Sequence, residues 1–598
     1  MKSSRDLPPS IPALWRSLKL GYRAEPLLLV VSFALTMAAA LPDALFALWL
    51  KLLASGVLHH HDGRVYAAAI GLGGSASAGW LLKIVGDRMQ RRFRDRATIA
   101  IEAHVARLQA SVPGIEHQER PEYLDRLSVL RDQVFALNHL YMSLFGIAGW
   151  VLRLGVTIVL LVSIHPALAA LAVFAIPTVI VSSWRSGAER AADERSAQHN
   201  RLARHLFVLG TTAPPGKEVR VTGTGARLIA DRRQAWERGY GPIASVRWGT
   251  AYWQSAAWAV FGAAYVAAIV FVASGLNAPA GDVLLVLAAG ARLSQYLGAT
   301  VFEVGFLRGI WLDSARRLAW LEDYAAELGA KADAPVPDRI ERGIRFDHVS
   351  FRYPGTDPLV LQDVSLDLPA GAVVAVVGEN GAGKTTLVKL LCRFYEPTEG
   401  RILIDDTELG RIPAEEWRER FAGAFQDFFR FEFQARHSVG IGDVDRLDDR
   451  PAVAAAVERA GAGDVVERLP RGLETQLGPT WPEGVEVSFG QWQKLALARG
   501  FMRDAPLVLV LDEPTAALDA ETEHALFERY AAAARSADGD VRGRVTILVS
   551  HRFSTVRMAD LIVVLDGARV AEVGTHEDLL ARRGQYAELY NIQAAAYR

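Results

Sequence analysis

Two short stretches of the chain carry residue types at spacings that suit phosphate chemistry. The first, "GENGAGKT" from Gly378 to Thr385, follows an apolar run and precedes a helical pattern of leucines. Its glycines let successive backbone N–H groups and a helix N-terminus face an anion. Lys384 can then reach the β- and γ-phosphates, and the Thr385 hydroxyl can ligate Mg²⁺. We therefore predict a nucleoside triphosphate site with these backbone and side-chain contacts: Gly378, Asn380, Gly381, Gly383, Lys384, Thr385 and Thr386.

The second stretch, "PLVLVLDEPTAALDA", is an apolar strand that ends in two carboxylates. Asp512, at the end of this strand, can hold Mg²⁺ directly or through water. Glu513 follows it and can act as the general base that polarises an attacking water. The sequence thus predicts a site for ATP and Mg²⁺ in an enzyme that hydrolyses ATP.

These motifs belong to an α/β domain that we place at residues 342–598. Short β-branched runs alternate there with helical patterns, and the best strands are "IRFDHVSFRY", "VSLDL", "AVVAVVG" and "LVLVLDE". The last two are apolar throughout, which is typical of parallel strands buried on both faces. A linker rich in Pro, Ala and Asp, at residues 326–341, precedes this domain.

The region from residue 26 to residue 325 has a different composition. A helix needs roughly 20 mostly apolar residues to cross a bilayer. Six runs satisfy this requirement: Leu27–Leu50, Ala67–Val85, Leu137–Val162, Ala167–Ser183, Tyr252–Ser274 and Val283–Ile310. We therefore predict a membrane domain of six transmembrane helices, followed by the nucleotide-binding domain.

The loops between these runs alternate in length and charge. Those after the second and fourth runs are long and rich in Arg, whereas the others are short. The positive-inside rule then places both long loops, both termini and the nucleotide-binding domain in the cytoplasm, for a multi-pass protein of the inner or plasma membrane. Helical periodicity in the long loops predicts that the spans continue beyond the bilayer. The segment 1–25 mixes Trp15 and Leu18 with cations, which favours a helix at the membrane surface or a solvated tail.

With these motifs in place, the chain resembles an ATP-binding cassette (ABC) transporter half-subunit of the exporter type. The resemblance covers nearly the whole chain and implies several further roles. It implies that Tyr353 in "FRYPG" stacks on adenine, and that Gln426 in "AFQDFFRF" contacts Mg²⁺ and senses the membrane domain. It also implies that Asp519 signals across a dimer, and that His551 contacts the γ-phosphate. The loop tips "HQERPEYLDRL" and "APPGKEVR" resemble the coupling helices that dock on nucleotide-binding domains.

The family's signature segment is altered in this sequence. Where the family has Leu-Ser-Gly-Gly-Gln, the chain reads "VSFGQ", so that Ser488, Gly490 and Gln491 remain and Phe489 replaces the first glycine. The resemblance implies that this segment meets the partner subunit's ATP. A phenylalanine is acceptable there if φ stays negative. The partner is then a second half-transporter, in a homodimer or a heterodimer, and the residues of the chain's own site are intact.

Composition limits other functions. The formal net charge of −1 offers no basic field for nucleic acid. The single cysteine, Cys392, lies in an apolar helical run, so we expect a buried structural thiol. The consecutive histidines His59, His60 and His61 have poor spacing for a metal site.

Ionisable residues within the spans are costly and are candidate functional sites. They are Asp43, Arg153, Arg292 and Glu303, and either mutual ion pairing or contact with substrate would explain them. Trp253, Trp258 and Tyr296 could line a cavity or belong to an interfacial belt. Overall we expect an ATP-driven exporter of an amphipathic small molecule, lipid or peptide that works by alternating access. The alternatives are an importer on the same fold, an ATP-gated channel or receptor, and a soluble ABC ATPase, which six spans disfavour.

Overall fold

The computed structural model describes residues 7–119, 123, 134–329, 332–513, 543–550 and 552–596. The chain divides into two compact units. The first contains residues Met1–Gln109 and Arg126–Asp323, and the second contains Ala110–Asp125 and Tyr324–Arg598. The tip of the first long loop therefore belongs to the second unit, although it lies between two membrane spans in the sequence.

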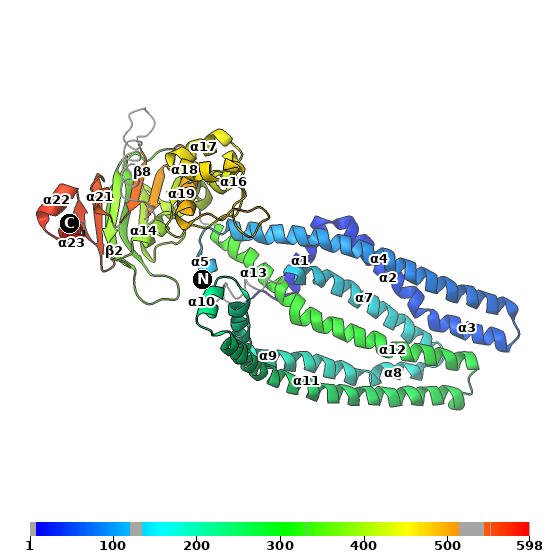
Figure 1. Cartoon of the computed structure of the whole chain (residues 1–598). Coiled ribbons are helices and arrows are strands. Elements are labelled where there is room, and N and C mark those ends of the chain that lie inside the picture. The colour runs from blue at the N-terminus through cyan, green and yellow to red at the C-terminus, as the bar shows by residue number, and fades with distance from the viewer. Residues whose placement is uncertain are drawn as a thin grey trace. The chain divides into compact units, whose positions relative to one another are not determined.

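All the regular elements among the described residues of the first unit are helices (Figure 1). Its helices are α1 (Ser10–Ala24), α2 (Pro26–Ala44), α3 (Phe46–Leu58), α4 (Asp62–Ser111), α7 (Val134–Val162), η1 (Pro166–Ala169), α8 (Ala170–Phe174), α9 (Ile176–Thr211), α10 (Gly216–Val221), α11 (Gly225–Val270), η2 (Phe271–Gly275), α12 (Ala280–Phe306), η3 (Leu307–Trp311) and α13 (Leu312–Gly329). The last residues of α4 and α13 extend into the second unit.

Six of these helical segments are long and apolar enough to cross a membrane, as predicted. They are Pro26–Leu58, Asp62–Ser111, His139–Val162, Pro166–Asp193, Gly225–Gly275 and Ala280–Phe306. The 50 residues of α4 span about 75 Å at about 1.5 Å per residue, far more than the hydrocarbon core of about 30 Å. The predicted continuation of the spans beyond the bilayer is therefore confirmed.

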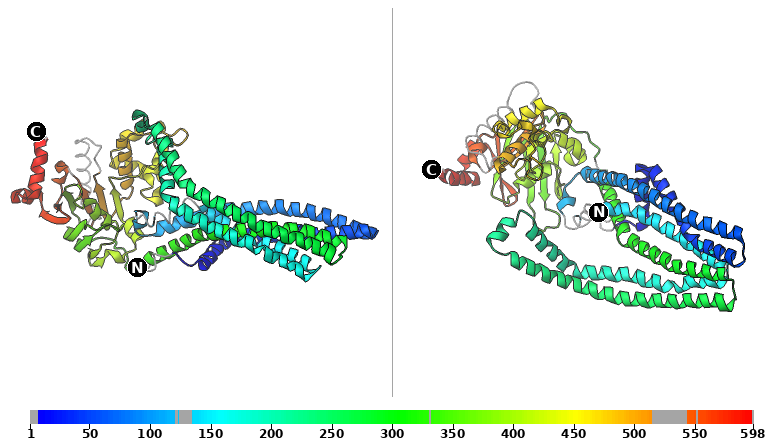
Figure 2. Two further views of the ribbon diagram at one scale, coloured as in Figure 1. Left: turned by 90° about the horizontal axis from the view of Figure 1, so that it is seen from below. Right: turned by 45° about the vertical axis from the view of Figure 1, so that its right-hand side comes forward.

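Among the spans, helices α9 and α11 pack mainly against each other. These two helices run side by side over their length (Figure 2), while α12 packs against α7 and α3. Buried Leu161, Phe261, Val272 and Leu285 contribute to an apolar cluster that joins α7, α11, η2 and α12. The first span is interrupted at Leu45, between α2 and α3, three residues after Pro42, which has no N–H to donate to the preceding turn.

The N-terminal segment forms helix α1, as expected for a surface helix. It buries only the small residues Ala13, Ser17 and Gly21, whereas Ile11 and Trp15 are largely exposed. This exposure of apolar side chains suits contact with a membrane surface.

The second unit contains two sheets. The first has the order β2-β1-β4-β5 and is antiparallel, with β1 (Gly343–Phe351), β2 (Leu361–Pro369), β4 (Glu399–Ile404) and β5 (Thr407–Glu408). The second has the order β10-β9-β3-β8-β7-β6, with β3 (Val373–Gly378), β6 (Phe421–Ala424), β7 (Val508–Asp512), β8 (Val545–Val549), β9 (Leu561–Asp566) and β10 (Arg569–Gly574). Four expected strands thus appear as β1, β2, β3 and β7.

The second sheet is parallel except for β10, and this arrangement positions the site. Every residue of β3 and β7 is buried, as their apolar sequences predicted. Because parallel strands share the direction of their carboxyl ends, the loops after β3, β6, β7 and β8 emerge at one edge of the sheet. The glycine loop, Gln426 and Asp512-Glu513 all follow these strands.

The helices of the second unit are α5 (Glu116–Glu119), α14 (Lys384–Leu391), η4 (Leu409–Arg411), α15 (Ala414–Glu419), α16 (Ala435–Gly440), η5 (Val444–Arg446), α17 (Arg450–Arg459), α18 (Gly463–Arg468), η6 (Gly472–Glu474), α19 (Phe489–Gly500), α21 (Phe553–Val556), α22 (His576–Arg582) and α23 (Gln585–Ala596). Cys392 is buried at the end of α14, and burial raises the pKa of its thiol, as expected of a structural thiol. Helix α13 continues to Gly329, inside the segment 326–341 that the sequence suggested as linker.

Candidate nucleotide-binding site

The glycine loop connects the end of β3 to the first residue of α14. Gly378, Gly381 and Gly383 have φ values of 151°, 85° and 100°, a region that favours glycine. A Cβ at Gly378 would lie 2.3 Å from the Leu565 carbonyl oxygen. Gly378 and Gly383 therefore require glycine for both conformation and space, whereas Gly381 requires it for conformation, and the loop can curve around an anion at the start of α14.

Lys384 lies within this loop. Its ammonium group donates hydrogen bonds of 2.9 Å to the carbonyl oxygens of Gly378 and Glu379. Burial lowers the pKa of Lys384 from its usual value, and the nearby carboxylates of Glu513 and Asp512 offset part of that shift. The ammonium group is thus already positioned in the loop where phosphate oxygens would arrive.

Asp512 ends β7 and is 1% exposed. Among the described residues, no donor meets hydrogen-bond geometry with either of its carboxylate oxygens. Burial raises the pKa of Asp512 to about 6, and the hydroxyl of Thr385 nearby lowers it in part. Two unpaired carboxylate oxygens beside a hydroxyl are hard oxygen ligands of the kind that Mg²⁺ takes, so these residues fit the expected metal.

Glu513 follows Asp512 in a constrained conformation. Its φ is 46°, its backbone N–H donates to the Val549 carbonyl oxygen at 2.9 Å, and its carboxylate accepts a 2.7 Å hydrogen bond from Gln426 Nε2. A left-handed conformation is uncommon for a residue other than glycine and persists where the surrounding structure holds it. Gln426 reaches Glu513 because β6 and β7 are neighbours and both end at the same edge.

Two predicted site residues, Asp519 and His551, lie outside the described residues. Their roles stay predictions.

Tyr353 lies beside the glycine-loop helix. Its hydroxyl is 3.0 Å from Thr386 Oγ1, and its ring packs edge-on against Phe351 and Tyr395. Lys389 lies over the same ring, 5.5 Å from its centroid. The tyrosine is therefore next to the nucleotide loop, and its stacking on adenine stays a prediction.

The signature segment opens helix α19. The Ser488 hydroxyl accepts from the Gln491 N–H at 3.3 Å, and Gln491 Oε1 accepts from the Ser488 N–H at 2.8 Å, which makes a capping box. Phe489 is not among the described residues with positive φ, so a side chain is accommodated without the freedom of glycine. Phe489 is 51% exposed, its ring centroid lies 5.4 Å from that of Phe428, and the Arg430 guanidinium lies 5.7 Å from the same centroid.

The tip of the first long loop contacts the nucleotide-binding fold within the second unit. The Ile115 N–H donates to the Phe394 carbonyl oxygen at 3.1 Å, and Arg418 donates to the Pro113 carbonyl oxygen. A Cβ at Gly114 would lie 2.9 Å from that same Phe394 oxygen. The tip therefore contacts the nucleotide-binding fold as expected, through residues just before the segment that the sequence singled out and through Glu119 within it, while residues 120–122 and 124–127 of that segment lie outside the described residues.

Side chains add to this contact. Glu119 accepts a hydrogen bond from Tyr395 and lies 3.8 Å from the Lys389 ammonium. His117 is buried, and burial lowers its pKa. Tyr395 and Lys389 also contact Tyr353, the aromatic residue beside the nucleotide loop. The tip of the first long loop and Tyr353 therefore contact the same two residues. No local sequence pattern indicates these shared contacts, because Tyr395 follows α14 as an ordinary apolar position.

The second loop tip forms the short helix α10 in the first unit. It buries none of its residues there, and Val221 is 88% exposed.

Three of the four ionisable residues singled out in the spans, Asp43, Arg153 and Arg292, are paired with one another. Asp43 forms ion pairs with Arg292 and, at 3.2 Å, with Arg153, and it accepts a 2.7 Å hydrogen bond from the Tyr296 hydroxyl. Glu303 accepts a 2.5 Å hydrogen bond from Ser143. Of the two alternatives left open by the sequence, mutual ion pairing is present at Asp43, Arg153 and Arg292.

The aromatic residues near these pairs differ in exposure. Tyr296 is buried, Trp258 packs on Phe261, and Trp253 is exposed. No cluster of three or more metal-ligating side chains occurs among the residues that the structure describes.

Comparison with known proteins identifies the architecture. The sequence profile of the family described as "ABC transporter" matches residues 361–516. A solved bacterial Atm1-family ABC exporter with ATP bound matches 97% of this chain and 99% of its own, with a TM-score of 0.74 and 25% identity. The chain has the exporter-type ABC half-transporter fold. It therefore contains an ATP-binding domain, and its six apolar helices make it a multi-pass membrane protein.

Curated relatives of this half-transporter match it over part of its length. The ATP-dependent lipid A-core flippase of Chromohalobacter salexigens is 43% identical over 258 residues, which cover 43% of this chain and 42% of the relative. That of Alkalilimnicola ehrlichii is 36% identical over 343 residues and 55% of each chain. A putative multidrug export ATP-binding/permease protein of Bacillus subtilis is 38% identical over 263 residues, which cover 44% and 43%. The matched part thus spans about half or less of the length of these relatives.

Proposed function

We propose that the chain is an ATP-hydrolysing subunit of a dimeric exporter of an amphipathic compound, with a lipid as the leading class. The observation that carries this proposal is the full-length likeness to an ABC exporter, combined with an ATP site in which Lys384, Asp512, Glu513 and Gln426 meet at one sheet edge. The flippase and drug-export names of the relatives support the amphipathic substrate class.

In the proposed mechanism the chain's own residues hold the triphosphate and activate water. The glycine loop and the start of α14 bind the phosphates through backbone N–H groups, and Lys384 exchanges its two carbonyl partners for phosphate oxygens. Asp512, Thr385 and Gln426 would hold Mg²⁺, which neutralises charge on the phosphates. Glu513, oriented by Gln426 and by the end of β8, takes a proton from the attacking water.

The signature segment supplies the reason for a dimer. Ser488 and the N–H of Gly490 lie at the capped start of α19, where they can meet the γ-phosphate bound by a partner subunit. ATP then favours the closed pair because it contacts both subunits only in that state. The long helices α4, α9 and α11 carry this change to the spans, with the nucleotide-binding domains and both termini in the cytoplasm. The exposed helix α10 is the surface that we assign to a partner's ATP-binding domain.

The test of the enzymatic part is Glu513→Gln in the full chain reconstituted in nanodiscs. We expect ATP binding to persist and turnover to fall by about 10²–10⁴-fold, the usual contribution of a general base. Glu486→Gln, an exchange in the signature region outside the site, serves as the matched control and should hydrolyse ATP normally. Wild-type turnover in Glu513→Gln would overturn the assignment of the base.

The direction of transport is tested in inside-out vesicles. ATP-dependent accumulation of a labelled lipid or amphiphile in the vesicle lumen is the expected result. Depletion of a preloaded compound would instead indicate an importer, and passive equilibration gated by ATP would indicate a channel. Activity of the chain expressed alone decides whether a homodimer is sufficient.

A further inference from the structure

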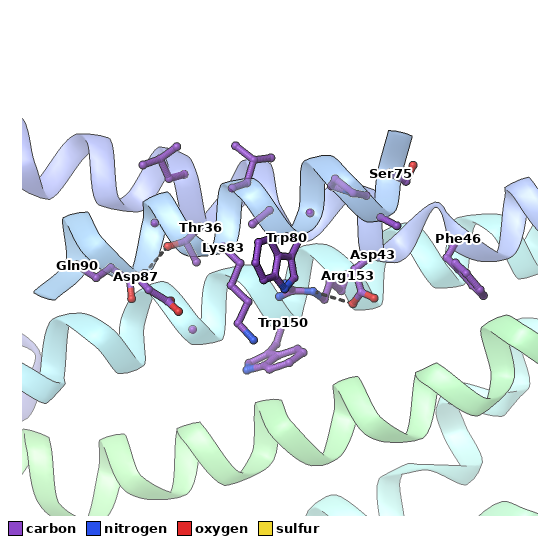
Figure 3. A pocket seen from close by; sticks show the side chains of 18 of the residues that line it. Thr36, Asp43, Phe46, Ser75, Trp80, Lys83, Asp87, Gln90, Trp150 and Arg153 are labelled. Atoms are coloured by element: carbon purple, nitrogen blue, oxygen red, sulfur yellow. Dashed lines mark hydrogen bonds and ion pairs between the residues drawn. The ribbon is translucent and has the colours of Figure 1, made fainter. Parts of the chain in front are cut away.

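A pocket inside the first unit is formed by the spans and lies beside the interruption of the first one (Figure 3). Its volume is about 670 Å³, within the range of small-molecule sites. Residues from α2, α3, α4, α7 and α12 line it, among them Phe46, Trp80 and Trp150. Interrupted helices near the middle of a membrane domain are places where transporters bind substrates.

The polar part of this pocket carries excess positive charge. Asp43, Arg153 and Arg292 all line it and form one cluster, with one carboxylate and two guanidinium groups. Lys83 and Asp87, one turn apart on α4, also line the pocket and cancel each other in formal charge. The cluster therefore retains one uncompensated positive charge among membrane helices, where such a charge is costly.

The two arginines are held differently. Arg292 donates hydrogen bonds to the Asp43 carboxylate and, at 2.5 Å, to the Asp43 carbonyl oxygen. Arg153 is held less tightly, because its buried Nε lies 3.2 Å from Asp43 Oδ2 as an ion pair and has no partner in hydrogen-bond geometry among the described residues. The Arg153 side chain is 17% exposed, with its guanidinium 4.6 Å from the Trp150 ring centroid. An arginine has five N–H donors, so Arg153 retains donors for another acceptor.

The rest of the wall suits an apolar group. Leu35, Ala39 and Met142 line the pocket together with the aromatic rings, and its mouth is partly open. A ligand that places an anionic group at Arg153 and an alkyl or ring portion along this wall would satisfy both parts of the pocket.

We propose that the pocket binds an amphiphile through a single anionic group, a phosphate or a carboxylate, with Arg153 as the anchoring residue and Asp43 as the counter-ion with which that group competes. Asp43 stays bound to Arg292 and Tyr296, which position it. The anion then replaces Asp43 only at Arg153, and the excess positive charge of the cluster is neutralised. This inference rests on the proposed export function, because it names the substrate class and a site for it.

The test measures binding without nucleotide, so that it does not depend on ATP hydrolysis. The full chain is placed in nanodiscs with zwitterionic lipid, and saturable binding of radiolabelled dodecyl phosphate is measured after subtraction of empty nanodiscs. We expect saturable binding that dodecyltrimethylammonium and inorganic phosphate compete with weakly or not at all. Inorganic phosphate that competes as well as dodecyl phosphate would mean a site for a free anion and would overturn the amphiphile.

Substitutions at the cluster test the named roles. Arg153→Gln should weaken binding about 10- to 100-fold, the effect of losing a hydrogen bond to a charged group. Arg153→Lys keeps the charge and should retain most of the affinity, which separates loss of the anchor from misfolding. Asp43→Asn removes the competing charge but keeps an oxygen for Arg292, so it should tighten binding several-fold.

Lys51→Gln is the matched control. It removes one cation of the same unit, which is paired with Asp282 at 2.6 Å and does not line the pocket. Dodecyl phosphate should bind this variant as it binds the wild type. Equal loss in Lys51→Gln and Arg153→Gln, or no tightening in Asp43→Asn, would overturn the proposed site. An ATPase-active chain with no saturable binding would overturn the pocket alone, whereas binding without ATPase activity would refute only the proposed function.

Discussion

The two units each contain an aspartate on which a site depends, and the surroundings of the two carboxylates are opposite. Asp512 is 1% exposed, and its oxygens have no hydrogen-bond donor in bonding geometry among the described residues. Asp43 faces a pocket and accepts from Arg292 and Tyr296 while it pairs with Arg153. A buried carboxylate without donors is costly unless a cation joins it, whereas a carboxylate with several donors holds them in place. We infer that the Asp512 carboxylate itself binds a cation, whereas the Asp43 carboxylate positions arginine side chains that can bind a ligand.

The largest effect is expected for Asp512→Asn. Loss of the metal-holding carboxylate should lower ATP turnover about 10²–10³-fold, since a metal supplies several kcal/mol of charge stabilisation and each factor of ten corresponds to about 1.4 kcal/mol. Without metal the variant should be more stable than the wild type at pH 7.5, by about 1–3 kcal/mol, because a buried charge has been removed. Turnover in nanodiscs and thermal unfolding in EDTA measure the two effects. Asp367→Asn, at an exposed strand position, is the control and should change neither.

Asp512 should also make Mg²⁺ affinity depend on pH. Its folded pKa of about 6 lies above the ordinary value of 3.8, so the carboxylate holds a proton below about pH 6. Metal binding must displace that proton, and the apparent affinity should fall about tenfold per pH unit below this point. The Mg²⁺-dependent rise in melting temperature, measured from pH 5 to pH 8, should show this slope in the wild type and lack it in Asp512→Asn. The same slope in both proteins would place the titrating group elsewhere.

Asp43→Ala should destabilise the membrane unit, in contrast to Asp512→Asn. Arg292 and Tyr296 lose their acceptor, and a buried donor left without a partner costs about 1–3 kcal/mol. Thermal unfolding in detergent should therefore begin at a lower temperature than in the wild type. Asp62→Ala, at the first turn of α4, is a control with the same change of charge. A stabilised Asp43→Ala protein would remove the contrast between the two aspartates.

Phe489→Gly should have the smallest effect. It restores the family residue at the first position of α19, and glycine in a helix costs about 0.5–1 kcal/mol relative to alanine. The contact with Phe428 is lost as well. We expect a slightly lower melting temperature and an ATPase rate within about threefold of the wild type, since Ser488 and Gln491 keep the capping box. An increase of tenfold or more in the ATPase rate would show that Phe489 weakens the part of the partner's ATP site that this chain contributes.

Local sequence determined those parts of this protein that depend on residues close together in the chain. The glycine loop, the buried strands that end at Gly378 and Asp512, and the six apolar spans each follow from patterns of about 5–20 residues, because backbone conformation and solvent preference act over that range. From the sequence, Phe489 is acceptable in the signature segment if its φ is negative. The structure meets this condition, because Phe489 is the first residue of helix α19.

Only the tertiary structure decided which distant residues meet. Asp43 and Arg292 are 249 residues apart in the chain, and either pairing or substrate contact was compatible with their sequence. Gln426 meets Glu513 because β6 lies next to β7, and Ile115 meets Phe394 although it lies just before the segment that the sequence singled out. Such contacts depend on strand order and helix packing, which sum many weak interactions across the chain, so no local pattern of residues specifies them.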